Sequence, residues 1–143
     1  MKIKVTNSTV IKPTTATPIT NLWISSLDAL MPTNYHTRTL YFYRSTGGPN
    51  FFDVTVLKAA LSRALVEFYP VAGRLKMDKN GRIEIDCNGK GVLFVEGEAD
   101  GDMDVLGDFG PKPELSLIPT VDYSKGIGSY PLFLLQIHTS IPR

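Results

Sequence analysis

The alternation of apolar and polar residues predicts a β-strand at the start of the chain. Lys2, Ile3, Lys4 and Val5 alternate with the period of two that is typical of a strand, and a strand is predicted from Lys2 to Val10. Lys12 to Thr20 is rich in Pro and Thr and predicts an irregular connector. Asn21 to Leu30 predicts a short helix, with Ser25 or Ser26 as N-cap and Asp28 in its first turn.

A second strand is predicted from Thr37 to Arg44. Thr39 and Tyr41 fall on one face of this strand, and Leu40 and Phe42 fall on the other. Because both faces carry large side chains, we expect an internal strand rather than one at a solvent-exposed edge.

The clearest predicted element is a helix that begins after Asp53, a plausible N-cap, and ends before Pro70. Its apolar residues recur at helical spacing, so that one side of the helix would pack on a sheet. They are Leu57, Ala60, Leu61, Ala64, Leu65 and Phe68.

After this helix the period changes to two. Turn residues separate three short runs, which predict an antiparallel meander of Arg74 to Met77, Arg82 to Cys87 and Val92 to Glu96. Glu96 to Asp108 is acidic and Gly-rich and predicts a solvated loop or a frayed helix. Leu132 to Ile137 is nearly continuously apolar and predicts a strand buried on both faces.

Composition excludes several classes of function. A chain of 143 residues with 43% hydrophobic residues is at most one domain. Its 15 basic and 14 acidic residues nearly balance, so no electrostatic field favours a nucleic acid or an anionic membrane as partner. No apolar run approaches the length of a membrane span. Cys87 is the single cysteine, which excludes an intramolecular disulfide and favours a reducing compartment, so we expect a cytosolic (cytoplasmic) protein.

Two histidines limit the possible catalytic chemistry. His36 and His138 belong to neither an HxxxD nor an HExxH motif, and the chain lacks further ligands for a zinc site, so we expect no bound metal. His36 directly precedes the predicted strand Thr37 to Arg44 and could form part of a pocket wall. His138 is interpreted as an incidental residue.

Two longer motifs carry a resemblance to a known family. FYPxAGRL is matched by Phe68 to Leu75, and RIEIDCNGKGVLFVE stands at Arg82 to Glu96. With them, Met1 to about Ile137 resembles the N-terminal region of the plant BAHD acyltransferases, most closely the hydroxycinnamoyl-CoA:shikimate/quinate hydroxycinnamoyltransferases.

The resemblance implies an α/β (α+β) fold. Residues 1–143 would be an incomplete N-terminal domain of the CoA-dependent acyltransferase fold, a mixed sheet with packed helices and a three-stranded meander, with the C-terminal domain absent. The family uses no cofactor. It takes an acyl-CoA as co-substrate and an alcohol as acceptor, in a channel between two domains, and most members are monomers.

In the family, the first step is proton removal from the acceptor by the His of an HHxxxDG motif. That motif does not occur in this sequence, so we expect no catalytic residue and no activity of this chain alone. The resemblance places Thr39 and Tyr41 in the acyl-substrate-binding wall, and His36 is a third candidate.

Two alternatives stay open at this point. The first is a non-catalytic remnant that binds a phenolic ligand or interferes with an intact homologue. The second is a complete small α+β module of unrelated function. Stabilisation of the chain by a ligand would favour the first alternative, and cooperative folding without a partner would favour the second.

Overall fold

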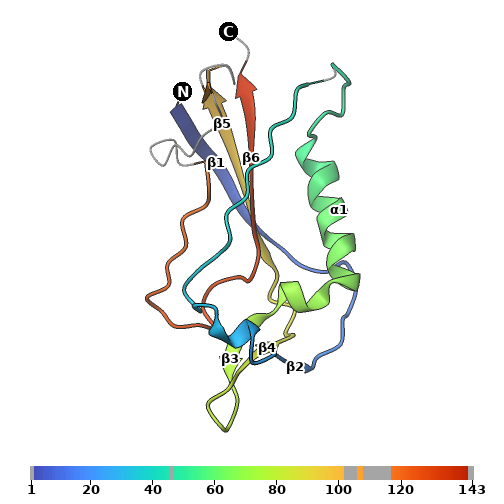
Figure 1. The fold of residues 1–143 in the computed structure, drawn as a ribbon. Coiled ribbons are helices and arrows are strands. Elements are labelled where there is room, and N and C mark those ends of the chain that lie inside the picture. Colours follow the sequence, from blue (N-terminus) through green and yellow to red (C-terminus); the bar gives the residue numbers. More distant parts are fainter. Residues whose placement is uncertain (1, 46, 102–105, 108–116, 142–143) are drawn as a thin grey trace.

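A computed structural model describes residues 2–45, 47–101, 106–107 and 117–141 of the chain. These residues form two three-stranded β-sheets, one α-helix and two short 3₁₀ helices (Figure 1). The prediction of a mixed α/β fold is confirmed. No helix in the described ranges is long and apolar enough to cross a membrane.

The larger sheet contains β1 (Lys2–Ile11), β5 (Val92–Asp100) and β6 (Leu134–Ile141), in the order β1-β5-β6. It is mixed, as predicted, because β5 pairs antiparallel with β1 and parallel with β6. The predicted strand at Leu132 to Ile137 is confirmed in kind, but it begins at Leu134 and lies at the edge of this sheet. Most of its described side chains are only half-buried.

The smaller sheet contains β2 (Asn21–Trp23), β3 (Arg74–Met77) and β4 (Ile83–Asp86), in the order β2-β4-β3. The meander is confirmed for its first two strands, which pair antiparallel as β3 and β4. It is wrong for the third, because β5 pairs with β1 in the larger sheet and β2 takes the place beside β4.

Gly91 lies where the chain passes from β4 in the smaller sheet to β5 in the larger sheet. This residue has φ +94°, and a Cβ atom there would lie 2.4 Å from the carbonyl oxygen of Ile11. Only glycine allows this backbone conformation at so close an approach to β1. The N–H of Gly91 also donates to the carbonyl of Ala72 at 2.8 Å, so the start of β5 is attached to the segment after the helix.

The helix predicted from Asn21 to Leu30 is wrong in its first part. Asn21–Trp23 forms β2, and only Asp28–Leu30 forms a helical turn, the 3₁₀ helix η1. Pairing with β4 outweighs the local preference, as tertiary context commonly does. The predicted serine N-cap is also wrong, because Leu27 occupies that position of η1. The Ser25 hydroxyl still accepts from the Asp28 N–H at 3.1 Å and donates to its carboxylate at 2.6 Å.

The strand predicted from Thr37 to Arg44 is also wrong. Residues 37–44 are all described and form no strand. Their side chains are exposed instead of internal, with Leu40 at 41% and Tyr43 at 57%. A strand derives its stability from pairing and from cross-strand contacts, and strand-like residues alone do not supply these.

Helix α1 (Val54–Glu67) confirms the strongest prediction. The Asp53 carboxylate accepts a hydrogen bond from the Val56 N–H at 2.9 Å, which satisfies one of the free donors at the helix start. The helix stops before the 3₁₀ helix η2 (Tyr69–Ala72), which contains Pro70.

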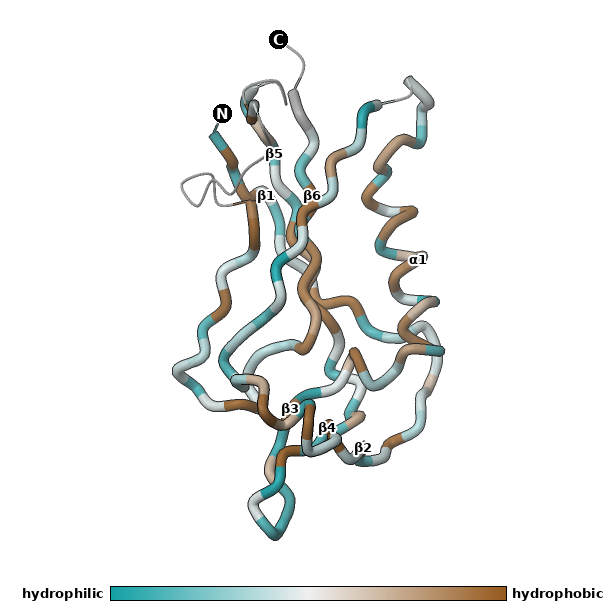
Figure 2. Tube along the Cα trace, viewed as in Figure 1, coloured by the Kyte–Doolittle hydropathy of each residue, from teal (hydrophilic) through white to brown (hydrophobic). Residues whose placement is uncertain are grey.

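The hydrophobic core lies between α1 and the larger sheet. Its buried residues come from elements far apart in the sequence: Ile11, Leu65, Ala72, Val92, Phe94 and Ile137. Figure 2 shows hydrophobic residues recurring along α1 and the strands, whereas the turn between β3 and β4 is hydrophilic.

An ion pair also joins α1 to the sheet. The Lys58 ammonium contacts the Glu96 carboxylate, which accepts from the Asn7 side-chain amide at 2.8 Å. Lys58 Nζ also lies 5.4 Å from the centre of the Phe94 ring. β5 continues through Glu96 to Asp100, so the loop or frayed helix predicted from Glu96 to Asp108 is wrong as far as Asp100. Residues 102–105 and 108 of that stretch lie outside the described residues.

Candidate functional site

Thr39 and Tyr41 lie in the open stretch of chain between η1 and α1 (Figure 1). Both side chains are exposed, and Tyr41 retains 75% of its accessible surface. An exposed phenol and an exposed hydroxyl two residues apart can both reach a ligand that lies along the segment. Their role in acyl binding stays a prediction.

Tyr41 is the outer end of a row of aromatic rings. Ring centres lie 6.5 Å apart for Tyr41 and Tyr43, 5.2 Å for Tyr43 and Phe52, and 4.9 Å for Phe52 and Phe51. These separations are in the range of favourable aromatic pairs. Phe52 is partly buried and packs against the core, whereas the other three rings are exposed, so the row is attached to the core through Phe52.

Phe52 occupies an unusual backbone conformation. Its φ is +53°, which is uncommon for any residue other than glycine and more so for a bulky one. The turn at Phe52 immediately precedes the Asp53 cap of α1, so packing and capping together hold the strained residue. The Phe51-Phe52-Asp53 segment thereby supports the inner end of the aromatic row.

His36 is a half-buried residue whose two ring nitrogens both have partners. Nδ1 lies 2.7 Å from the Tyr123 hydroxyl, and Nε2 lies 2.8 Å from the carbonyl oxygen of Pro131. A carbonyl only accepts, so Nε2 carries the proton, and in the neutral ring Nδ1 accepts from the Tyr123 hydroxyl. Both nitrogens are thus hydrogen-bonded within the chain, so neither is free to take a proton from a substrate hydroxyl. The role of His36 in acyl binding stays a prediction.

The rings of two tyrosines, Tyr123 and Tyr130, pack beside the His36 ring. The His36 ring centre lies 5.7 Å from those of Tyr123 and Tyr130, and the two tyrosines are 4.9 Å apart with an edge-to-face geometry. The Tyr130 hydroxyl donates to the carbonyl of Thr33, and burial raises the pKa of this phenol. Sequence reasoning missed Tyr123 and Tyr130, since no local pattern connects residues about 90 positions away to His36.

His138 is not the incidental residue that the sequence suggested. It lies in β6 opposite Gly97, and its Nδ1 is buried without a hydrogen-bond partner among the described residues. Burial lowers the pKa of this imidazole. A Cβ atom on Gly97 would lie only 2.8 Å from Nδ1, so the ring depends on that glycine for its space. A nitrogen enclosed in this way cannot take a proton from a substrate hydroxyl.

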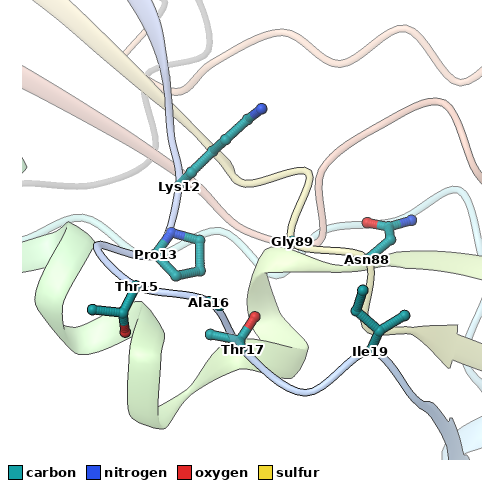
Figure 3. Close-up of a pocket in the computed structure, with 8 residues that line it drawn as sticks. All are labelled: Lys12, Pro13, Thr15, Ala16, Thr17, Ile19, Asn88 and Gly89. Atoms are coloured by element: carbon teal, nitrogen blue, oxygen red, sulfur yellow. The ribbon is translucent and has the colours of Figure 1, made fainter.

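The structure also has a surface pocket, away from the predicted site residues (Figure 3). The connector after β1 and the turn after β4 form its walls: Lys12, Pro13, Thr15, Ala16, Thr17, Ile19, Asn88 and Gly89. None of His36, Thr39 and Tyr41 lines this pocket. Thr39 and Tyr41 are exposed and lie outside this pocket, and His36 is half-buried.

The described residues bring together no group of three or more His, Cys, Asp or Glu side chains that could hold a metal ion. The fold and the site define an α/β domain with exposed aromatic rings at Tyr41 and Tyr43, in which neither histidine is placed for proton transfer.

Comparison with known proteins identifies the family. Residues 1–140 match the model of the Transferase family. Rosmarinate synthase of Plectranthus scutellarioides is 60% identical over 137 residues, and shikimate O-hydroxycinnamoyltransferase of Nicotiana tabacum is 62% identical over 138 residues. The chain therefore belongs to the Transferase family, the BAHD acyltransferases, as its motifs predicted.

The fold agrees with this assignment. The crystal structure of vinorine synthase superimposes with a TM-score of 0.61 at 24% sequence identity, over 97% of this chain and 35% of that protein. Each of the two relatives above is matched over 96% of this chain but only 32% of its own length. The chain thus spans about a third of the length of these relatives.

Proposed function

We propose that this chain forms the acyl-binding wall of an acyl-CoA-dependent hydroxycinnamoyltransferase. The observation that carries the proposal is the 62% identity, over 138 residues, to a shikimate O-hydroxycinnamoyltransferase. Relatives named hydroxycinnamoyltransferases from Narcissus pseudonarcissus and Oryza sativa, 51% and 50% identical, support the same acyl class. Shikimate or quinate is the proposed acceptor.

The proposed reaction is a direct acyl transfer. A general base takes the proton of the acceptor hydroxyl, the oxygen attacks the thioester carbonyl, and coenzyme A leaves as the thiol. His36 and His138 do not fit the role of base, for the geometric reasons given above. The contribution of this chain is accordingly the recognition of the hydroxycinnamoyl group.

Tyr41 is the residue best suited to that recognition. Its phenol is exposed, and its ring continues the row formed by Tyr43, Phe52 and Phe51. A planar acyl ring could stack at the end of this row, with its para-hydroxyl close to the Tyr41 hydroxyl. Thr39, two residues before Tyr41, is also exposed and offers a second hydroxyl.

A fusion of residues 1–137 to the continuation of the tobacco relative tests the proposal. We expect the fusion to transfer the p-coumaroyl group from its CoA thioester to shikimate, and the 143-residue chain alone to transfer none. Transfer to neither shikimate nor quinate by a folded fusion would contradict the proposed function.

Tyr41→Phe in the fusion tests the site itself. A neutral hydrogen bond contributes about 0.5–1.5 kcal/mol, so kcat/KM for p-coumaroyl-CoA should fall about 2- to 12-fold. Cinnamoyl-CoA has no ring hydroxyl and is the matched control, with a much smaller expected loss. Equal losses for both donors would show that Tyr41 supports the fold and does not contact the acyl group.

A further inference from the structure

The segment that carries Thr39 and Tyr41 is attached to the rest of the molecule at both of its ends. Residues 37–44 are described throughout and form no strand, so strand pairing does not fix their position. At one end, His36 contacts Tyr123 and Pro131. At the other end, the Tyr43 ring packs on Phe52 at 5.2 Å.

The contact at His36 has chemical requirements that few side chains meet. On one side of the ring an N–H must face the Pro131 carbonyl, and on the opposite side a lone pair must face the Tyr123 hydroxyl. The neutral imidazole supplies both within one rigid ring. The edge-to-face contact with Tyr130, a residue that is only 4% exposed, fixes the plane of the ring.

We propose that His36 is a positioning residue: its two hydrogen bonds hold the start of residues 37–44 against the Tyr123–Pro131 segment and so orient Thr39 and Tyr41. The consequence for acyl recognition rests on the proposed function. The attachment itself does not, because it follows from contacts within this chain. His36 thus acts through Thr39 and Tyr41 and does not touch the acyl group.

Limited proteolysis of the 143-residue chain tests the attachment without any need for activity. Trypsin can cut after Arg38, the exposed second residue beyond His36, and after Arg63 within α1. When opening and closing are fast, the rate of each cut follows the population of the locally open state. Cutting after Arg38 reports the segment, and cutting after Arg63 reports unfolding of the helix.

His36→Phe keeps a ring and removes both hydrogen bonds. Each neutral hydrogen bond changes an equilibrium about 2- to 12-fold, so cutting after Arg38 should become about 5- to 140-fold faster, with cutting after Arg63 much less affected. Tyr123→Phe removes one hydroxyl and should give the effect of one bond. His36→Gln keeps a donor for the Pro131 carbonyl and should restore part of the protection.

Two results would overturn the proposal. One is an unchanged rate after Arg38 in His36→Phe. The other is an equal acceleration after Arg38 and Arg63, which would show loss of the whole fold. Either result leaves the acyl-transfer test of the fusion unaffected, and failure of that test leaves the proteolysis result unaffected.

Discussion

The helix–sheet core and the segment of residues 37–44 have similarly apolar sequences but different structures. In the core, α1 and β5 bury residues such as Leu65 and Phe94, which are 3% and 0% exposed. In the segment, Tyr41 and Leu40 keep 75% and 41% of their surface exposed. Both regions carry a pattern that predicts regular structure. Among the described residues, the core elements form the helix and strands that their patterns predict, whereas residues 37–44 form no strand.

The comparison shows that a strand pattern is a conditional signal. β5 pairs with β1 on one side and with β6 on the other, so its residues have neighbours in both adjacent strands. The segment 37–44 instead contacts the rest of the chain through aromatic rings, such as Tyr43 with Phe52. Burial and pairing together convert a pattern into an element, and a pattern alone does not.

The largest expected effect comes from opening the core. Phe94→Ala should lower the free energy of unfolding by about 3–5 kcal/mol, because it removes a completely buried ring beneath α1. Tyr41→Ala is the matched control in the exposed segment and should change that free energy by no more than about 0.5 kcal/mol. Urea unfolding followed by circular dichroism measures both. Similar losses for the two variants would abolish the contrast between the regions.

A smaller effect is expected at the start of α1. Asp53→Ala removes the side-chain acceptor for the Val56 N–H and should cost about 0.5–2 kcal/mol of stability. Asp53→Asn keeps an acceptor and should stay close to the original protein. If Asn were as destabilising as Ala in the same urea titration, charge rather than capping would explain the role of Asp53.

The smallest effect concerns pH and His138 in β6. Burial lowers the folded-state pKa of this imidazole, so the unfolded chain binds the extra proton first as the pH falls below about 6.5. Stability is therefore complete above that pH and declines from there down to the lowered folded-state pKa. Thermal unfolding between pH 5 and 8 measures this. His138→Gln should flatten the decline, and an unchanged slope would assign it to other groups.

The site could be predicted from the sequence only in part. The resemblance selects Thr39 and Tyr41, whose role in acyl binding stays a prediction. The strand spacing that placed them on one face does not apply, because residues 37–44 form no strand. The partners of His36 could not be found from the sequence, since Tyr123 and Pro131 lie 87 and 95 positions further along the chain. That both ring nitrogens are hydrogen-bonded within the chain depends on those distant partners.

The sequence by itself determined the family, through its two long motifs, and those elements whose causes are local. The N-cap at Asp53, the periodicity of α1 and the turn between β3 and β4 all arise from neighbouring residues. Only the tertiary structure decided that β5 joins β1, that Asn21–Trp23 pairs as a strand, and that residues 37–44 form none. The physical reason is that a strand needs a partner, and the pairing between β1 and β5 joins residues up to 98 positions apart, such as Lys2 and Asp100.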